Sequence, residues 1–303
     1  MSPPRSALLV DASIYLYRGW HHWPASTIDR AGRPSNALAG LADTLVDLLA
    51  RERPALAVCA LDTCGRSGTR NRLYPAYKRS RPPVPPVLLE QLARARDLVP
   101  RLGVATFGSE RVEADDIVGH FANVSRAAGH PVTVVSGDKD LAQFVLGRGD
   151  VYLDAGRQPK RDARALERRL GVPTAAVADW LALCGDRSDD IPGVPGVGPA
   201  ISARLIRKWG SLDVLYANLS AVPAMRFRGA PGVATLLAEH EPTVRLARRL
   251  TGLLDDPSLP VGIDALTRRP VDVDAVREAL LDAGLAPHHA EERAESLLVA
   301  DTA

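Results

Sequence analysis

Acidic side chains recur in this chain of 303 residues at the points where apolar runs end. A side chain at the end of an apolar run is presented to a ligand or to solvent rather than buried. The recurring acids are Asp11, Asp62, Glu113, Asp115, Asp116, Asp138, Asp140, Asp186 and Asp189. Two carboxylates about 4 Å apart repel by roughly 4 kcal/mol at an effective dielectric near 20. A bound hard cation, Mg²⁺ or Mn²⁺, offsets such repulsion, so the pattern predicts a metal-dependent phosphoryl-transfer enzyme.

Strand-like and helix-like patterns alternate in the first half of the chain. The expected strands are residues 7–10, 55–61, 103–107 and 132–135, and the expected helices are residues 36–49, 88–98 and 117–128. This alternation predicts an α/β fold with a largely parallel central sheet flanked by helices. Ligands bind beyond the carboxyl ends of the strands in such sheets, which is where Asp11, Asp62 and Asp138 fall. The topology therefore predicts that the fold gathers these acids.

The pattern changes to helices after about Tyr152. An amphipathic stretch, residues 174–183, is followed by a glycine-rich turn and then by the expected helix 199–209, which has proline in its first turn. A Gly-x-Gly pattern that follows a helix rather than a strand does not indicate a dinucleotide site. It is typical of a helix-hairpin-helix, whose backbone N–H groups approach a DNA phosphate, although a plain structural turn explains it too. Residues 271–300 are expected to form terminal helices.

Composition excludes several classes of protein. The chain is 46% hydrophobic and 24% charged, which is typical of a soluble globular protein. It has no apolar run long enough for a transmembrane helix. The first apolar run, residues 7–10, is too short for a signal peptide, so secretion is not expected and a cytoplasmic location is. Three scattered cysteines are too few for a zinc site or a disulfide framework.

The net charge of +2 conceals an uneven distribution of charge. Many acids fall in the candidate site, so the remaining surface should be basic. The basic stretches are residues 66–81, 160–169, 204–208 and 245–249. An acidic centre ringed by Lys and Arg suits a polyanion that is held and cut. Any one stretch taken alone is better explained as a solvated helix face.

Five motifs occur in the order and at the spacings of one known family. They are Leu-Val-Asp at 9–11 with Tyr-Leu-Tyr-Arg at 15–18, Tyr-Lys-Arg-Ser-Arg-Pro-Pro at 77–83, Val-Glu-Ala-Asp-Asp at 112–116, Ser-Gly-Asp-Lys-Asp at 136–140, and the acidic and glycine-rich stretch 185–198. The chain thereby resembles the flap endonuclease and 5′-3′ exonuclease family, especially the 5′-nuclease domain of bacterial DNA polymerase I. Because no polymerase domain fits in the remaining residues, a free-standing nuclease is expected.

The resemblance implies a PIN-like 5′-nuclease fold with a particular division of the chain. Residues 1–172 would form the α/β nuclease core, with a helical arch at about residues 70–100. Residues 173–270 would form a helix-three-turn-helix DNA-binding region, followed by C-terminal helices at 271–303. The proline-rich stretch 82–86 is stiff and extended, so it should interrupt any helix in the arch.

The resemblance also implies a mechanism, namely hydrolysis of phosphodiesters by water activated at two or more divalent ions. The first ion would be held by Asp11, Asp62, Glu113, Asp115 and Asp116. The second would be held by Asp138, Asp140, Asp186 and Asp189. Spacing supports this, since Glu113 and Asp116 share a face at i, i+3 if that run opens a helix. Acids at a helix start are also good capping residues.

Basic and aromatic residues complete the expected site. By resemblance, Lys78 would reach the scissile phosphate as an electrophile, with Arg81 beside it, and Asp115 and Asp138 would be the main catalytic carboxylates. Tyr77 would offer a stacking face for an unpaired base. The other expected DNA contacts are Arg18, Arg70, Gly193, Gly196, Gly198 and Arg204. In the family, carbonyls of the glycine turn also hold a K⁺ ion.

The function expected from this resemblance is cleavage of 5′ flaps and degradation of DNA from 5′ ends, in replication or repair, by a monomer. The substrates would be DNA with a 5′ flap, a nick or a 5′ end, and RNA–DNA hybrids. Two alternatives remain, a ribonuclease and a DNA-structure-binding protein with little or no activity. One departure is Asp190, where the family usually has Asn. This carboxylate could strengthen metal capture or could pair with Arg187.

Overall fold

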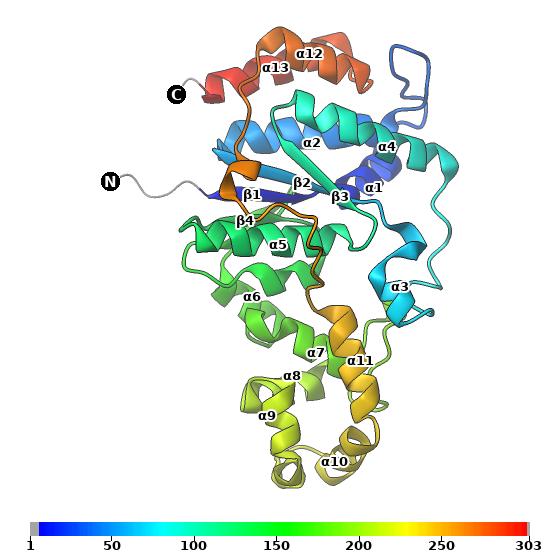
Figure 1. Cartoon of the computed structure of the whole chain (residues 1–303), viewed down its shortest axis with the longest axis vertical. Coiled ribbons are helices and arrows are strands. Elements are labelled where there is room, and N and C mark those ends of the chain that lie inside the picture. Colours follow the sequence, from blue (N-terminus) through cyan, green and yellow to red (C-terminus); the bar gives the residue numbers. More distant parts are fainter. Residues whose placement is uncertain (1–5, 302–303) are drawn as a thin grey trace.

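A six-stranded sheet organises the first half of the chain (Figure 1). The computed structural model describes residues 6–301, without the side chains of residues 157, 158 and 298–301. The strands are β1 (Ala7–Asp11), β2 (Leu56–Asp62), β3 (Ala105–Ser109), β4 (Val132–Val135), β5 (Val151–Asp154) and β6 (Arg157–Arg161). Their order is β3-β2-β1-β4-β5-β6, and every pair is parallel apart from β5 with β6. The predicted α/β fold with a largely parallel sheet is confirmed.

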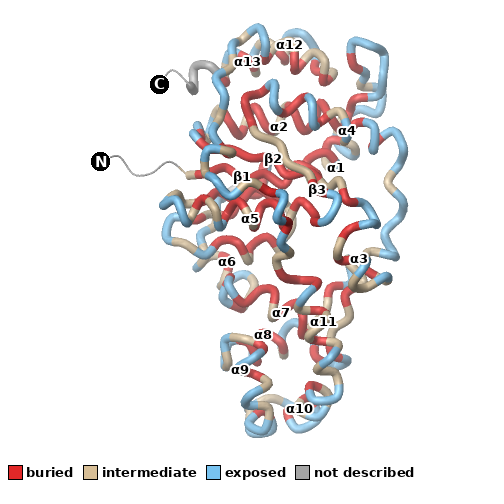
Figure 2. Tube along the Cα trace, in the orientation of Figure 1, coloured by how far each residue is buried: buried red, intermediate tan, exposed pale blue. Residues whose placement is uncertain are grey.

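Helices cover both faces of the sheet (Figure 1). One face carries α1 (Ala12–His22), α2 (Asn36–Glu52), α4 (Pro86–Arg101), α12 (Val273–Asp282) and α13 (Pro287–Asp301); the other carries α5 (Ala114–Ala127) and α6 (Ala163–Leu170). Because side chains alternate across a strand, β1 serves both cores. Its Leu8 and Val10 pack with the first group of helices, whereas its Ala7 and Leu9 pack with the second. Figure 2 shows the strands and the inner helix faces buried.

A separate apolar cluster holds the helical part together below the sheet (Figure 1). Its helices are α7 (Val177–Cys184), α8 (Pro199–Trp209), α9 (Leu212–Ala217), α10 (Ala230–Glu239) and α11 (Glu241–Thr251). The short helix α3 (Thr69–Leu73) connects the two parts, since Arg70 on it donates a hydrogen bond to the carbonyl of Leu250 in α11. None of the helices described within residues 6–301 has the length and apolar character needed to cross a membrane.

One expectation from the sequence is corrected, and one is met. The chain is not purely helical after Tyr152, because β5 and β6 form an antiparallel hairpin there. The sequence of β6, Arg-Gln-Pro-Lys-Arg, has no apolar alternation, and its Pro159 is tolerated because the strand lies at the sheet edge. The arch segment between α3 and α4 is irregular at residues 74–85, as the proline-rich stretch 82–86 predicts. Prolines in this segment lack backbone N–H donors and so prevent a continuous helix.

Two glycines allow the backbone to pack tightly between α7 and α8. A Cβ atom on Gly193 would lie 2.3 Å from the carbonyl carbon of Cys184, and Gly185 has a φ of +72°. Nearby, the N–H group of Val194 donates to the carbonyl of Leu183 at 2.8 Å. Gly193 is therefore required for close packing of the turn that leads into α8.

Substitution of Gly193 by alanine should lower the free energy of unfolding by about 2 kcal/mol or more, because the added methyl group forces the backbone apart. Gly198→Ala is the matched control, since a Cβ atom there meets nothing within 4 Å and the φ of −78° suits alanine. Urea unfolding followed by circular dichroism measures both variants. Equal stability of the two variants would show that the close contact is unimportant.

Candidate active site

The carboxyl ends of three strands bring acids to one edge of the sheet. Asp11 ends β1 and caps α1, where its carboxylate accepts a hydrogen bond from the N–H group of Ile14 at 3.4 Å. Asp62 ends β2, and its carboxylate accepts the N–H group of Ala114, the first residue of α5, at 2.7 Å. Asp138 follows β4 and caps a short 3₁₀ helix. Since β1 and β4 are neighbours whose connections leave in opposite directions, this edge is the topological switch point.

A cavity of about 350 Å³ lies at this edge. The predicted site residues that line it are Asp11, Asp62, Lys78, Arg81, Glu113, Asp115, Asp138 and Asp189. They come from distant parts of the chain, on β1, β2, α5, the loop after α3, the loop after β4 and the loop after α7. The fold thus assembles a cavity with six carboxylates and two cationic side chains in its wall.

The carboxylates in the cavity repel one another. Burial, with the charges of Asp62 and Asp138, raises the pKa of Asp11 to about 7. Burial, with the charges of Asp11 and Asp138, raises the pKa of Asp115 well above its ordinary value. The pKa of Asp62 is raised by burial and by the charge of Glu113. The raised pKa values mean that the ionised forms of Asp11, Asp62 and Asp115 are disfavoured in this cavity. A positive charge bound nearby would stabilise these ionised forms.

Glu113 differs because it has cationic and hydroxyl partners. Lys78 Nζ lies 2.7 Å from its Oε1 atom, and the hydroxyl of Tyr77 donates to its Oε2 atom at 2.8 Å. Burial alone would raise the pKa of Glu113, but Lys78 and Arg70 outweigh this and lower it. Tyr77 is only 3% exposed, so the prediction that its ring stacks on a base is wrong for this conformation. Tyr77 instead orients the carboxylate.

The loop that carries Lys78 is hydrogen-bonded to the loop between α7 and α8. The N–H group of Lys78 donates to the carbonyl of Asp189 at 2.9 Å, and Arg81 Nε donates to the carbonyl of Ser188 at 3.1 Å. The guanidinium of Arg81 also pairs with the carboxylate of Asp189. Lys78 has a left-handed φ of +52°, which is uncommon for a residue with a side chain. These hydrogen bonds hold that conformation in place.

Asp190 takes neither role that the sequence left open. Its carboxylate accepts the N–H group of Ser80 at 2.7 Å, and this hydrogen bond lowers its pKa. Asp190 has a φ of +55°, in the left-handed region that Asn and Asp enter more readily than other side chains. Either residue can therefore serve at this position.

A second group of acids lies around Lys139. Its Nζ atom is 3.2 Å from Asp186 and 3.4 Å from Asp140 Oδ1. Burial and the charge of Asp138 raise the pKa of Asp140 to about 7, and its Oδ1 atom is buried without a hydrogen bond. Burial would raise the pKa of Asp186, but hydrogen bonds from Ser188 and the charge of Lys139 lower it. The sequence analysis overlooked Lys139, although its place between two acids in the Ser-Gly-Asp-Lys-Asp motif was a signal.

Asp116 and Arg70 are corrected from ligand-binding to structural roles. Arg70 is 6% exposed and forms two contacts with Asp116, at 2.5 and 2.9 Å. Asp116 also accepts the N–H groups of Glu113 at 3.1 Å and Leu254 at 2.9 Å. Both oxygen atoms of Asp116 are thus occupied, and neither side chain faces the cavity. The capping role considered for acids at this helix start is the one that Asp116 has.

The remaining predicted DNA contacts lie in three places. Arg18 pairs with Asp154 at 2.5 Å and donates to the carbonyl of Ala155 at 3.0 Å, so it is engaged within the protein. Gly196 and Gly198 are exposed at the start of α8, and Arg204 is exposed further along it. These last three remain available to a ligand.

The acids form a suitable but incomplete ligand set for metal ions. Among residues 6–301, no three His, Cys, Asp or Glu side chains are arranged as a complete metal-binding group. Carboxylate oxygens are nevertheless the ligands that Mg²⁺ and Mn²⁺ prefer. The raised pKa values of Asp11 and Asp140 fit a site that receives positive charge. The carboxylates that line the cavity therefore fit divalent ions by the chemistry of their donor atoms.

Two protein-family models match the chain. Residues 6–171 match the model for the 5′-3′ exonuclease N-terminal resolvase-like domain. Residues 172–274 match the model for the 5′-3′ exonuclease C-terminal SAM fold. The chain belongs to the 5′-3′ exonuclease family.

Individual relatives fall into two groups by length. The chain is 36% identical over 260 residues to DNA polymerase I of Pseudomonas aeruginosa, a match that covers 86% of the chain and 28% of the relative. It is 26% identical to a 5′-3′ exonuclease of Buchnera aphidicola, over 86% of the chain and 90% of the relative. The chain therefore spans about a quarter to a third of its polymerase relatives.

Two kinds of solved structure share the fold. The T5 5′-exonuclease with bound zinc has a TM-score of 0.65 and 18% identity, covering 98% of this chain and 100% of that one. The catalytic core of Rad2 with a DNA substrate has a TM-score of 0.60 and 15% identity, covering 98% and 92%.

A pair of adjacent substitutions should separate structural from cavity-facing acids. Asp116→Asn should lower the free energy of unfolding by about 3 kcal/mol, because it leaves the buried Arg70 cation unpaired. Asp115→Asn should raise it at neutral pH without divalent ions, because the raised pKa means that ionised Asp115 destabilises the folded state. Thermal or urea unfolding in EDTA measures both. A loss of stability in the Asp115 variant would contradict the assignment.

Proposed function

We propose that the chain is a structure-specific 5′ nuclease that hydrolyses phosphodiester bonds in DNA with the help of divalent metal ions. The observation that carries this proposal is the cavity where Lys78 and Arg81 face six carboxylates at the carboxyl ends of the strands. A phosphodiester is an anion that carboxylates alone would repel. The combination of hard oxygen ligands for cations with two fixed side-chain cations suits the charge of a phosphate under attack. Membership of the 5′-3′ exonuclease family supports the same reaction.

Two groups of acids would hold the ions, which we propose to be Mg²⁺ or Mn²⁺. Asp11, Asp62, Glu113 and Asp115 would hold one. Asp138, Asp140, Asp186 and Asp189 would hold the second. When bound, the ions would lower the pKa of the attacking water and stabilise the charge that develops on the phosphate.

Lys78 would exchange partners when substrate arrives. Burial alone would lower the pKa of Lys78, but the charges of Glu113 and Asp189 raise it, so the ammonium is firmly protonated. Its backbone is held by a hydrogen bond to Asp189, and its ammonium group would turn from Glu113 to a phosphate oxygen. Arg81, whose side chain is 47% exposed, would contact the same phosphate from the cavity rim. Both residues thus supply positive charge from fixed positions.

The helical region would bind the duplex beside the cut. The exposed glycines 196 and 198 at the start of α8 leave room for a DNA backbone to approach the helix N-terminus, where N–H groups and the helix dipole favour a phosphate. Such contacts read shape rather than sequence. A K⁺ ion at the carbonyls of this turn would support the same contact. The nuclease core would end near residue 172 and the DNA-binding region would cover residues 173–270.

The proposed substrates are DNA with a 5′ flap, a nick or a 5′ end, together with RNA–DNA hybrids. The proposed setting is DNA replication or repair in the cytoplasm, by a monomer. The competing function is binding of DNA structures with weak cleavage or none. The observation that favours it is that Lys78 and Lys139 lie between the carboxylates and already supply positive charge there.

Single-turnover cleavage of a 5′-labelled flap duplex tests the two functions against each other. Wild-type protein should cut near the flap junction with Mg²⁺ or Mn²⁺ and not with EDTA. Asp138→Ala and Asp186→Ala should each lower the rate by about a thousandfold or more while flap binding persists, because acids that hold the ions are lost. Asp97→Ala is the control, since this exposed acid lies on α4, outside the active-site cavity. Tight binding without any cut would favour the competing function.

Replacement of Lys78 by alanine should slow the chemical step more than it weakens binding. We expect the single-turnover rate to fall by about a hundredfold or more, because a charge positioned for the transition state is lost. The dissociation constant for the flap should change by less than about threefold. Arg79→Ala, at an exposed neighbouring position, is the control. A drop in affinity at an unchanged rate would show that Lys78 only tethers the DNA.

A further inference from the structure

A groove of about 530 Å³ lies between α6 and α8, on the helical side of the molecule. Arg164 and Arg168 of α6 and Arg207 of α8 line it, together with a single carboxylate, Glu167. All three arginines are exposed. The groove is separate from the active-site cavity and shares no lining residue with it.

The arginines of this groove carry uncompensated charge. Within residues 6–301, Arg164 and Arg168 form no ion pair, and Arg207 makes only a hydrogen bond to the carbonyl of Ala203, at 3.2 Å. Exposed arginines commonly pair with a nearby carboxylate, as Arg51 does with Asp47 at 3.1 Å. The groove therefore presents three guanidinium groups to solvent against one carboxylate.

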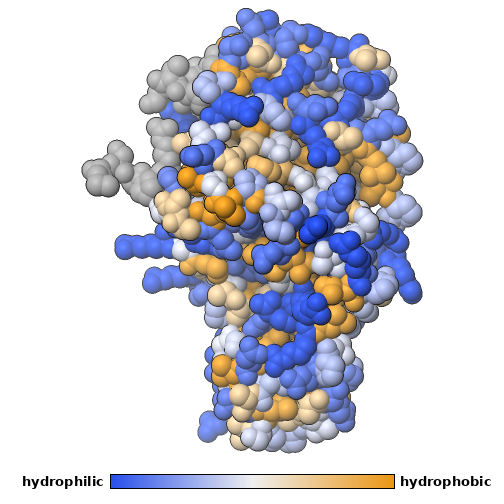
Figure 3. Space-filling model, in the orientation of Figure 1, coloured by the Kyte–Doolittle hydropathy of each residue, from blue (hydrophilic) through white to orange (hydrophobic). Residues whose placement is uncertain are grey.

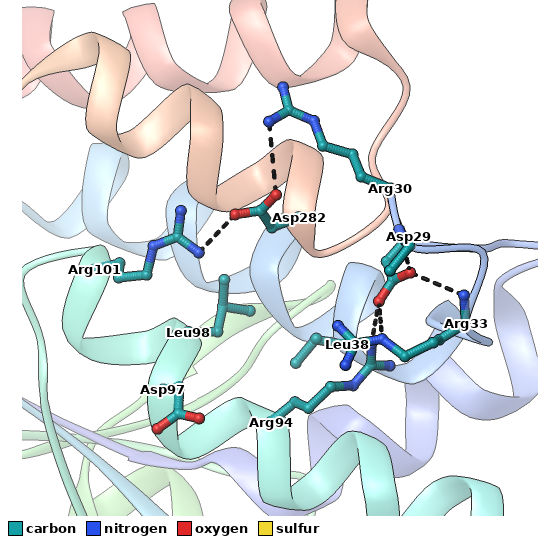
Figure 4. A pocket seen from close by; sticks show the side chains of 10 residues that line it. Asp29, Arg30, Arg33, Leu38, Arg94, Asp97, Leu98, Arg101 and Asp282 are labelled. Atoms are coloured by element: carbon teal, nitrogen blue, oxygen red, sulfur yellow. Dashed lines mark hydrogen bonds and ion pairs between the residues drawn. The ribbon is translucent and has the colours of Figure 1, made fainter.

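Another arginine-rich cavity shows why pairing matters. The cavity of about 410 Å³ between α4, α12 and the loop before α2 is lined by four arginines (Figure 4). There Arg101 pairs with Asp282 at 2.9 Å, and Arg94 pairs with the buried Asp29 at 2.5 Å. The dashed lines in Figure 4 show that carboxylates of the protein itself neutralise this cavity. Its arginines are neutralised by the protein itself, whereas those of the groove at α6 are open to an anionic ligand.

The helix geometry aligns the groove with the proposed duplex contact. Arg164 and Arg168 are four residues apart, so they lie on one face of α6, about 6 Å apart. The opposite face is anchored by Leu166, which is 4% exposed. At its end, α6 meets α8, since a Cβ atom on Gly171 would lie 3.8 Å from Ala203. The guanidinium groups of two helices thus border a single channel.

Arg207 lies on the same helix as the glycine turn, at the opposite end. Gly198 caps the start of α8 and Arg207 lies in its last turn, nine residues on, which corresponds to about 13 Å along the helix. Duplex DNA carries about one charge per 1.7 Å of its axis, so a backbone that touches the turn presents many phosphates at this distance. On the face drawn in Figure 3, hydrophobic and hydrophilic side chains are interspersed.

We propose that Arg164, Arg168 and Arg207 form a second contact surface for the phosphate backbone of duplex DNA, beyond the glycine turn. The proposal rests on the proposed function. It adds that the bound duplex extends from the glycine turn along the groove between α6 and α8. Arginine binds phosphate through a planar fork of donors and stays charged at any physiological pH. Because phosphates are the same in every sequence, such a surface binds DNA without sequence preference. Glu167 sits among the arginines and weakens the contact.

The test is DNA binding by fluorescence anisotropy in Ca²⁺, on flaps whose duplex beyond the cut is long or short, about 20 or about 6 base pairs. The triple variant Arg164→Gln, Arg168→Gln, Arg207→Gln should bind the long duplex at least about tenfold more weakly, with a salt dependence reduced by about 0.9 per lost contact. On the short duplex it should match wild type. The control variant Arg51→Gln, Arg101→Gln, Arg277→Gln removes the same charge from paired arginines.

Glu167→Gln removes the negative charge of the groove instead of its positive charges. Because it is expected to strengthen binding, a folding defect cannot imitate its effect. It should strengthen binding to the long duplex by about twofold to threefold, because a like charge is removed from the phosphate path. Equal affinity of wild type and the triple variant for the long duplex would overturn the proposal. So would an equal loss on both duplexes, which would place the contact on the single-stranded flap. If wild type neither binds nor cuts flaps, the proposed function itself fails, so the two failures are distinguishable.

Discussion

Repulsion among buried carboxylates is the constraint on which the rest of this molecule depends. The parallel sheet places Asp11, Asp62 and Asp138 at one edge, where their side chains cannot move far apart. Burial raises the pKa of Asp11 and Asp62, and the neighbouring carboxylates raise it further. The protein answers with fixed cations, Lys78 between Glu113 and Asp189, and Lys139 between Asp140 and Asp186. The two lysines therefore mark the places where the carboxylates favour a bound cation most strongly.

The position of Lys78 joins the two halves of the structure. Its left-handed backbone costs of order 1 kcal/mol and is held by hydrogen bonds to the loop between α7 and α8. That loop is in turn fixed by close packing of Gly193 against Cys184. The helical region therefore determines where a cation stands over the carboxylates of the sheet.

The sequence was sufficient for those features that follow from periodicity and topology. The strands β1, β2 and β4 and the acids that follow them were predictable, because an apolar run and a carboxylate after it leave few alternatives. The hairpin β5–β6 was not, since β6 has no apolar alternation. The sequence also could not predict that Asp115 lines the cavity whereas the adjacent Asp116 pairs with Arg70. Only the fold shows that Arg70 and two N–H groups occupy both oxygens of Asp116.

The same reasoning applies to the arginines, which are numerous and almost indistinguishable in sequence. What distinguishes them is whether a carboxylate of the protein already neutralises each one. Arg70 and Arg94 lie against buried aspartates and so stabilise the fold. Arg164 and Arg168 lie on an exposed helix face with one carboxylate between them. A chain whose net charge is only +2 can therefore still bind a polyanion, because its acids and its unpaired arginines lie in different places.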